Sequence, residues 1–562
     1  MRLLVQKGST LSGPSQAALE AAILAGPPRS MYVADIDNDV WNKTVDQSVW
    51  LRLSKLQQGA CQLSEKSILI LGRISHSNPT WSISPNDREE FSSWSSSNAD
   101  ADFDDIYQVD YAPRKRKDLV HWLTIPVSEE VFHTDTWRQT CRERFFHSLL
   151  ALHDLSNMEQ WPVQRWREAL QTWSEDALIT RSAKCLPPIL TSMPSRPFIS
   201  LQRTISWWVK EASNTEHVDI HLETLISLCG RALEITHEKE EAAATTRQEE
   251  HQPVLSAINH TIGFTSQALI KLWLSQKPRD NDGIASEFKT LFLKLCDRNN
   301  IFYIHGRVIL LSHLITFYRV DEKWTRENLL PLLRWKGNRT ETTAAWAGFL
   351  WSPRLYPPLM SIIKKDFLET SKHYDILGDH QEHYAVLFTN FALDCFEASD
   401  HEDLRKALSR LPKEGLSIVA RALWQALEGA GHQKEYFWNN RIKPFWLNVW
   451  PKDNSFMSNA IAINLAHLCL SSGREFPAAF QLVRHWLSAN DDPSFLIHLL
   501  RQTDFPSQFP SSTLEYLHAV TGERNSPKHD LNDILEIVAK SKPDIANSPL
   551  YLKLKSKKGN FI

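Results

Sequence analysis

Apolar side chains recur every three or four residues in short segments along almost the whole chain. One such stripe consists of Trp41, Val45, Val49, Leu53 and Leu56. This spacing places the apolar groups on one face of an α-helix. Breaks with Pro, Gly or Asp divide the chain into segments that are each as long as one helix. Such a helix is too short to bury its apolar stripe alone and needs a neighbouring helix. The sequence therefore predicts an all-α fold of stacked helical pairs, similar in character to armadillo and HEAT solenoids.

The glycine and tryptophan contents support this prediction. The chain has 18 Gly in 562 residues, which is below the usual share of about 7%. Because all-β folds and phosphate-binding loops both use many glycines, their scarcity favours helices. The 21 Trp residues are numerous, and tryptophan at helical spacing is typical of a core. We expect more than half of the residues in helices and almost none in strands.

The length of the chain indicates two or more lobes. Residues 92–117 interrupt the helical pattern with a Ser-rich run, then Asp residues, and then the basic run Arg114–Lys117. This composition is typical of a flexible linker. The predicted parts, in chain order, are an N-terminal helical segment (1–91), the linker (92–117), a helical lobe (118–336) and a C-terminal helical lobe (337–562).

Charge and cysteine usage exclude several classes of protein. The net charge is −3, which argues against a globally basic nucleic-acid-binding protein. Seven Cys without a CxxC pair exclude a zinc ribbon and a dense disulfide framework. The longest apolar stretches are too short to span a membrane, and the first residues lack the apolar region of a signal peptide. We therefore expect a cytoplasmic protein with reduced, buried thiols.

Catalytic and cofactor motifs are absent from the sequence. It contains no GxGxxG, GxxxxGK[ST] or GxSxG pattern. The segment His401–Arg405 departs from HExxH, because Arg405 stands where the second His is required. We therefore predict no catalytic residue, no cofactor and no metal.

Two clusters of residues keep weaker alternatives open. His373, His380 and His383 lie beside acidic residues and offer zinc ligands if a helix brings them together. A polar helix start is the simpler interpretation of this histidine cluster. Arg114–Lys117 offer a contact to phosphate, but the preceding Asp residues favour a linker that neutralises itself.

The most distinctive passage runs from Ala345 to Met360. Trp346 and Leu350 are four residues apart on one helical face, and we expect both to be buried at a helix junction. Gly348 allows a neighbouring helix to approach closely. Ser352-Pro353 is expected to end this helix and to start the next, which would place Arg354 in a first turn. The candidate structural or interaction residues of this passage are Trp346, Phe349, Trp351, Arg354 and Tyr356.

Several stretches resemble the C-terminal region of bacterial sirtuin-like anti-phage proteins, a region whose own function is unknown. The stretches, which together span most of the chain, are Gly8–Pro14 with Ala17–Pro28, Trp166–Glu175, His305–Leu310, Trp346–Leu359, and Leu411–Leu416 with Ala426–Gly431. Trp346–Leu359 is the most specific of them. In that family, a sirtuin-like NAD-consuming module precedes this region, and the helical part is thought to sense infection or to assemble the complex.

The chain departs from the family pattern where the NAD chemistry would lie. It has no sirtuin glycine fingerprint and no paired Asn-Asp nicotinamide signature, so no catalytic residue carries over. The resemblance implies a non-catalytic sensing, regulatory or scaffolding part of an anti-phage defence protein. It implies a sirtuin-like effector module as partner and a phage-derived protein as trigger, and it leaves self-association open.

The short helix Ala17–Leu24 is apolar almost all round, so it is expected to need cover on more than one side. A preceding module is one source of that cover, and burial within this chain is the other. Two further functions from other classes remain. One is a hydrolase with scattered acidic and histidine residues, and the other is a nucleic-acid-binding helical scaffold, which the net charge makes the less favoured.

Overall fold

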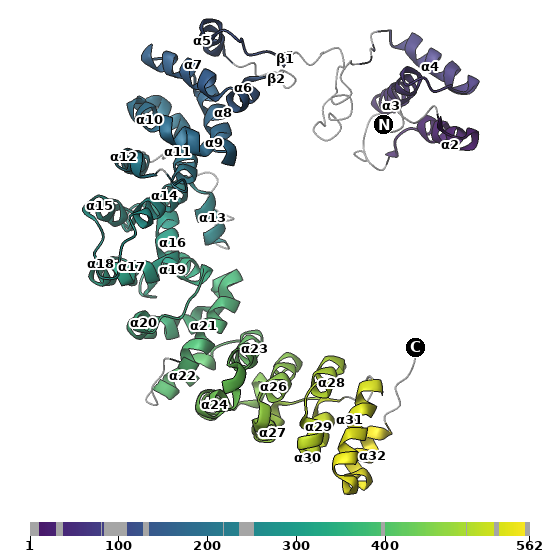
Figure 1. Ribbon diagram of the computed structural model, residues 1–562, viewed down its shortest axis with the longest axis vertical. Coiled ribbons are helices and arrows are strands. Elements are labelled where there is room, and N and C mark those ends of the chain that lie inside the picture. The colour runs from purple at the N-terminus through teal and green to yellow at the C-terminus, as the bar shows by residue number, and fades with distance from the viewer. Residues whose placement is uncertain are drawn as a thin grey trace. The chain divides into compact units, whose positions relative to one another are not determined.

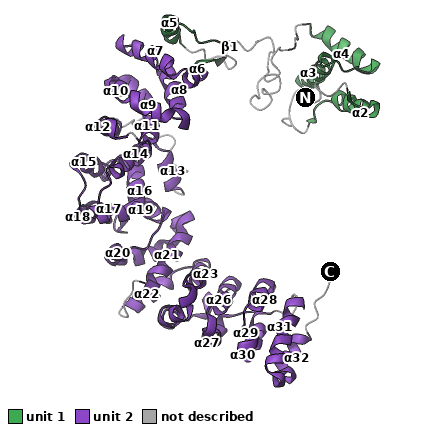
Figure 2. Ribbon diagram, in the orientation of Figure 1, with its two compact units in different colours: residues 1–137 green, residues 138–562 purple. Residues whose placement is uncertain are grey.

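The computed structural model describes residues 10–29, 38–79, 81, 83, 109–126, 134–216, 218–234, 252–394, 400–490, 492–521 and 528–556. The described residues are almost entirely helical, which confirms the all-α prediction (Figure 1). The strands among them are β1 (Val109–Asp110) and β2 (Thr134–Asp135), which form one short parallel pair. The chain divides into two compact units, residues 1–137 and 138–562 (Figure 2).

Unit 1 has a small core of its own, which lies between three of its four helices. Its helices are α2 (Gly13–Leu24), α3 (Asn38–Gln58), α4 (Glu65–Ser77) and α5 (Arg116–Thr124). Ile23, Trp50, Leu53 and Ile74 are buried together where α2, α3 and α4 meet. Most of the predicted linker, residues 92–108, lies outside the described residues. Arg116 and Lys117, which the sequence analysis assigns to that linker, form the start of α5.

Unit 2 is built on a series of helices in which each packs against the next. This main ladder consists of α8 (Val163–Trp173), α11 (Ser195–Ala212), α14 (Thr261–Ser275), α16 (Ile304–Ser312), α19 (Arg339–Trp351), α21 (Gln381–Asp394), α23 (Lys413–Gly429), α26 (Asn459–Ser471), α28 (Ser494–Arg501) and α31 (Lys528–Ser541). Figure 1 shows α11, α14, α16 and α19 following one another along the chain. The contact of α16 with α19 crosses residue 337, where the sequence analysis begins the C-terminal lobe.

Flanking helices cover the main ladder and pair with one another, for example α10 with α12, α20 with α22, and α30 with α32. The flanking α-helices are α6 (Trp137–Glu143), α7 (Phe145–Asn157), α9 (Asp176–Cys185), α10 (Pro187–Ser192), α12 (Leu222–Glu234), α13 (Pro253–Asn259), α15 (Ser286–Leu295), α17 (Leu314–Val320), α18 (Glu322–Asn328), α20 (Pro357–Glu369), α22 (His401–Leu408), α24 (Lys434–Phe437), α25 (Lys443–Asn448), α27 (Phe476–Val483), α29 (Phe505–Gln508), α30 (Pro510–Val520) and α32 (Pro549–Lys555).

Short 3-10 helices and one π-helix connect these elements. They are η4 (Val218–His221), η5 (Ile301–Tyr303), η6 (Leu330–Leu333), η7 (Thr370–His380), η9 (Gly431–Gln433), the π-helix η10 (Trp438–Ile442), η11 (Asn454–Phe456), η12 (Gly473–Glu475), η13 (Arg484–Trp486) and η14 (Pro543–Asn547). Polar side chains begin several helices. In α19, for example, Asn338 Oδ1 accepts the backbone N–H of Thr340 at 3.0 Å, which satisfies a donor that the helix itself leaves without a partner.

Tryptophan fills much of the core of the described chain, as its helical spacing predicts. The largest fully buried tryptophans of the described chain are Trp137, Trp166, Trp173, Trp208, Trp273, Trp346, Trp438, Trp446 and Trp450. Hydrogen bonds between adjacent repeats join residues separated by about one repeat length in the sequence. Arg167 donates to the Ser200 carbonyl, 33 positions away, and Trp424 to Asn464, 40 positions away.

A buried ion pair and a glycine hold α16 against α19. The Arg307 guanidinium, on α16, donates to both carboxylate oxygens of Glu341, on α19, at 2.9 and 2.6 Å. It also donates to the Asp297 carbonyl oxygen at 2.7 Å. On α19, Gly348 faces α16 so closely that an added Cβ would lie 2.4 Å from the Val308 carbonyl oxygen. Only glycine permits this helix separation.

Among the described residues, no single helix is both long and apolar enough to cross a membrane. The pair Ile301–Ser312 and Leu314–Val320 meets the length and composition criteria only when the two are taken together, and the chain bends by 70° between them.

The close contact of α16 with α19 gives a prediction for two glycines. Gly348→Ala should lower the free energy of unfolding by about 1–3 kcal/mol, because the added methyl group overpacks the interface. Gly429→Ala is the matched control, since the new Cβ meets nothing within 4 Å. That change should leave stability unchanged or raise it by up to about 1 kcal/mol. Urea unfolding of both variants measures the difference, and equal effects would contradict close packing at Gly348.

Candidate functional site

The passage around Trp346 is mainly part of the core. Trp346 and Leu350 are fully buried, as predicted for a helix junction. The Trp346 indole N–H donates to the Leu333 carbonyl oxygen at 2.9 Å. Phe349 is also buried and meets the Trp346 ring edge-on, with ring centroids 5.8 Å apart. Trp346 therefore joins α19 to η6, and Phe349 packs against its ring.

The rest of the passage lies at the surface. Trp351 is 40% exposed, Arg354 is exposed, and Tyr356 is half-buried against Tyr318. The expectation that Arg354 lies in a first helical turn is wrong, because α20 begins only at Pro357. Proline fits the first positions of a helix, and the pair Pro357-Pro358 provides that start rather than Ser352-Pro353.

The three histidines of the predicted alternative metal site do not come together as a ligand set. His373 stacks on Trp335 with ring centroids 3.9 Å apart. His383 Nδ1 lies 2.8 Å from the Leu350 carbonyl oxygen, and His380 is buried beside it. Within the described part of the chain, the ligand atoms of these histidines form no compact group of three.

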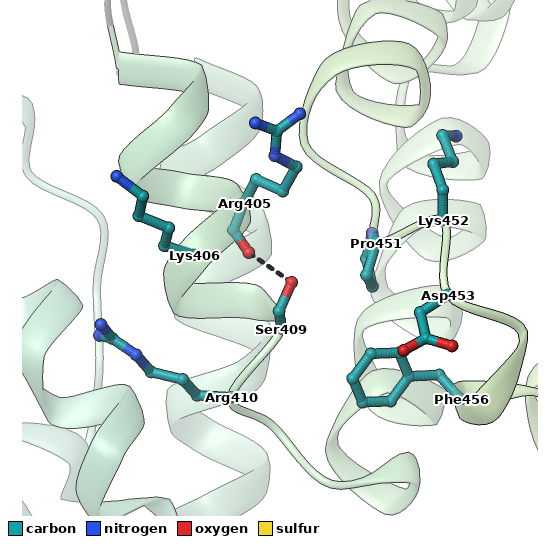
Figure 3. A pocket seen from close by; sticks show the side chains of 8 residues that line it. All are labelled: Arg405, Lys406, Ser409, Arg410, Pro451, Lys452, Asp453 and Phe456. Carbon is teal, nitrogen blue, oxygen red and sulfur yellow. Dashed lines mark hydrogen bonds between the residues drawn. The ribbon is translucent and has the colours of Figure 1, made fainter.

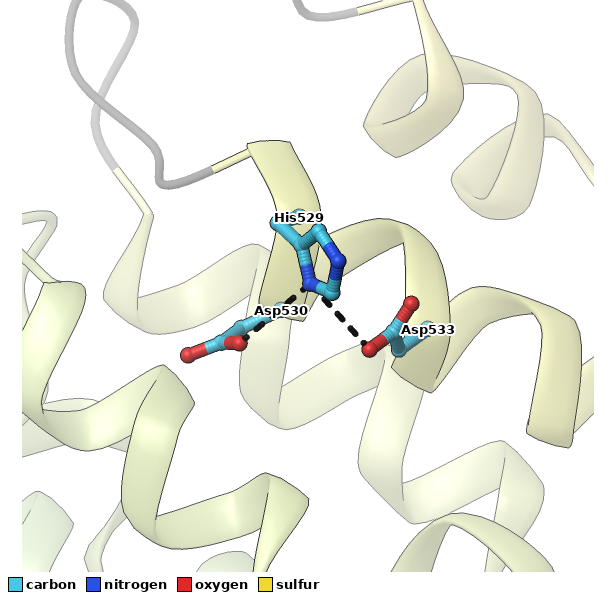
Figure 4. Close-up of side chains that lie close together, drawn as sticks. All are labelled: His529, Asp530 and Asp533. Carbon is cyan, nitrogen blue, oxygen red and sulfur yellow. Dashed lines mark ion pairs between the residues drawn. The ribbon is translucent and has the colours of Figure 1, made fainter.

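A different group, His529, Asp530 and Asp533, does bring three potential ligand atoms together at the start of α31 (Figure 4). His529 Nδ1 lies 3.3 Å from Asp533 Oδ2. However, the Arg501 guanidinium pairs with both carboxylates, at 2.5 Å from Asp530 and 2.8 Å from Asp533. Because this cation neutralises the acidic groups, the cluster fits an ion-pair contact between α28 and α31 better than a metal site.

A pocket of about 470 Å³ with several charged residues in its lining lies at the end of α22 (Figure 3). One wall comes from α22 and the turn after it, and the other from the segment that follows α25. The lining residues are Arg405, Lys406, Ser409, Arg410, Pro451, Lys452, Asp453 and Phe456. Four of these eight side chains are cationic and one is acidic. The pocket is therefore a candidate site for an anion.

Local contacts fix several of these residues in place. Lys452 Nζ donates to the Trp446 carbonyl oxygen at 2.6 Å and lies 4.6 Å from the centre of its ring. Burial lowers the pKa of Lys452 to about 8. Asp453 Oδ1 accepts the Ser455 N–H at 2.8 Å, and this bond lowers the pKa of Asp453. The single acid of the pocket is thus occupied in capping η11.

The sequence pattern does not reveal this pocket, because its two walls come from different repeats. The basic residues at the end of one helical segment, Arg405, Lys406 and Arg410, were the available signal. Nothing in the sequence shows that Lys452 and Phe456 would face them.

Comparison with known proteins places the chain in no family of known function. No family model and no solved structure matches it. It is similar to a protein of Sinorhizobium fredii (strain NBRC 101917 / NGR234) named "Uncharacterized protein y4cA", with 20% identity over 551 residues. The match covers 90% of this chain, and the chain spans only 42% of that relative's length.

A buried histidine next to the Arg307 ion pair makes stability depend on pH. His305 stacks on His260 with ring centroids 4.0 Å apart and is 4% exposed. Burial first, and then the neighbouring charges of His260 and Arg307, lower the pKa of His305 from 6.5 to about 3. The folded chain therefore keeps this ring neutral between about pH 6.5 and 3, where the unfolded chain protonates it.

Because the unfolded state binds the extra proton, this group destabilises the fold as pH drops below about 6.5. The expected slope is at most about 1.4 kcal/mol per pH unit. His305→Gln has no such proton, so its stability relative to the wild type should rise as pH is lowered from 7 to 5. Urea unfolding at each pH measures this difference. A difference independent of pH would contradict a buried neutral His305.

Proposed function

We propose that this chain is a non-catalytic sensing and scaffolding part of a bacterial anti-phage system, and that its effector is a sirtuin-like NAD-consuming module. The observation that carries the proposal is the main ladder of unit 2, in which each helix packs on the next from α8 to α31. Such repeat architectures present long surfaces that suit the binding of other macromolecules. The sequence resemblance supports the anti-phage context and the sirtuin-like partner.

The relative from Sinorhizobium supports the idea of a part that works with further segments. The region that matches this chain makes up less than half of that protein. In the relative, a region similar to this chain is therefore joined to additional polypeptide. We expect such a combination of a helical region with additional polypeptide if the helical region works together with an effector.

Unit 1 offers the surface at which we place the effector. The Glu20 carboxylate, on α2, accepts the Ser64 N–H and the Ser67 hydroxyl, at 3.1 and 2.6 Å. These bonds and buried Ile23 fix α2 against the start of α4. On α4, Ile68 and Leu69 are 51% and 74% exposed. Exposed apolar side chains next to each other favour contact with a protein partner.

The side of α2 that faces away from this core carries the small residues Ala17, Ala18, Ala21 and Ala22, all exposed. Because this helix is apolar almost all round, we expect it to need cover on more than one side. The described chain covers it on the side of Glu20 and Ile23. A docked effector would cover Leu69, and the alanine side of α2 is a further exposed apolar surface of the same unit.

A binding experiment tests the proposed function. The sirtuin-like module, supplied as a separate chain, should form a complex with the full-length protein in size-exclusion chromatography. Leu69→Asp should weaken this complex at least about tenfold, because it places a charge in the apolar contact. The matched control, Lys43→Asp, changes an exposed residue of α3 in the same unit and should leave binding unchanged.

Two outcomes would contradict the proposal. One is the absence of any complex with the module. The other is NAD or nucleic-acid hydrolysis by the purified chain alone that disappears on mutation of a carboxylate, which would support the hydrolase alternative.

A further inference from the structure

The ends of several helices in unit 2 meet along one edge. The Trp335 indole N–H, in the turn after η6, donates to Thr370 Oγ1 at 2.8 Å. Next along the edge, Arg410 Nη1 lies 3.4 Å from Ser371 Oγ. The pocket then joins Arg410 to Lys452 on the following repeat. The segments after η6, α22 and α25 and the start of η7 are therefore neighbours, and their exposed side chains share one edge of unit 2.

This surface, which we name the basic edge, carries many cations. They are Arg334, Lys336, Arg339, Lys372, Arg405, Lys406, Arg410 and Lys452. Its acidic residues, which include Asp403 on α22, are fewer than its cations, and three of them have local partners. Glu369 pairs with Lys372, and Glu402 with Lys406, each at 2.6 Å, while Asp453 caps η11.

The remaining cations give the basic edge its net positive charge. Asp366 lies near Arg334 and Lys336 and offsets part of their charge; burial raises the pKa of this carboxyl group, and the two cations lower it. In the described part of the chain, Arg339, Arg405 and Arg410 form no ion pair. Cations in the last turn of a helix also stabilise it, which applies to Arg405 and Lys406 in α22. This interaction with the helix end does not explain the positions of Arg334, Arg339 and Arg410, because these residues lie outside the last turn of a helix.

The directions of the side chains favour an extended anion over a small one. Figure 3 shows Arg405 extending between the two walls of the pocket, whereas Lys406 and Arg410 extend away from the wall that contains Pro451. The charges are therefore spread along the surface and do not converge on a single point. An anion that contacts all of them must itself be extended.

The chemistry of the basic edge favours nucleic acid over an acidic protein. The large exposed apolar residues of the described chain do not include any residue of these turns. Protein interfaces usually require apolar or aromatic anchors, whereas nucleic-acid interfaces are more polar and positively charged. Arginine, which supplies four of the eight cations, binds phosphate oxygens through two parallel hydrogen bonds.

We propose that the basic edge binds the phosphate backbone of a nucleic acid. Arg334, Arg405 and Arg410 contact successive phosphates, and Lys336 and Lys452 add long-range attraction. Contacts to phosphate alone carry no sequence information, so this binding is independent of base sequence. The net charge of the whole chain is −3, so the overall composition does not indicate this local concentration of positive charge.

Fluorescence anisotropy of the full-length chain tests the proposal. The probes are a labelled 30-nucleotide single strand of mixed sequence and the matching duplex. Wild-type affinity should fall about 10- to 100-fold between 50 and 200 mM KCl, as expected for three or four phosphate contacts. The double variant Lys336→Glu/Arg405→Glu changes two turns of the basic edge and should lower affinity at 50 mM KCl at least tenfold.

A matched control separates local from global charge. Lys323→Glu/Lys540→Glu makes the same change in net charge at exposed residues of α18 and α31 and should reduce affinity less than threefold. Thermal unfolding monitored by circular dichroism should be the same for both double variants. Absence of binding at 50 mM KCl, or an equal loss in the control, would overturn the proposal. Equal or tighter binding of poly-glutamate, which would indicate an acidic protein partner, would overturn it as well.

Discussion

The buried ion pair between Arg307 and Glu341 fixes the contact of α16 with α19 near the middle of the main ladder. The Arg307 side chain is 2% exposed, so its charge has lost nearly all contact with water. Two oxygens of Glu341 and backbone carbonyl oxygens from the end of α15 replace that water. Because an uncompensated buried charge is costly, the guanidinium holds α16, α19 and the chain before η5 in one arrangement.

The order of the ladder follows from such local contacts. Gly348 lets α19 approach α16 closely enough for the ion pair to form, and Trp346 fixes the same helix to η6. Each helix of a repeat protein contacts mainly its neighbours, so stability is a sum of repeats and interfaces. The same stacking aligns the helix ends, and this alignment brings Arg334, Arg410 and Lys452 to one edge.

Helical periodicity was sufficient to predict the fold and the core. The stripe from Trp41 to Leu56 forms α3, and Trp346 and Leu350 are buried as their spacing indicates. Periodicity is a local property and says nothing about which repeats touch. It therefore could not place Phe456 opposite Arg405, nor reveal that Arg501 occupies the carboxylates near His529.

The unexpected start of α20 and the separation of the three histidines have the same origin. The start of α20 depends on which of two proline sites begins the helix, and Pro357 does so where Pro353 was expected. The histidines at 373 and 383 are close in sequence, but stacking on Trp335 and a contact to the Leu350 carbonyl oxygen direct them to different neighbours. In both cases the local structure depends on contacts with residues that are distant in the sequence.

A double-mutant cycle on Arg307 and Glu341 tests the central claim most directly. The free energy of unfolding is measured by urea denaturation for Arg307→Met, Glu341→Gln and the double variant. Each single change should cost about 3–5 kcal/mol, because it leaves the partner charge buried alone. The double variant should cost at least about 2 kcal/mol less than the sum of the single changes. Additivity within about 0.5 kcal/mol would show that the pair does not hold α16 against α19.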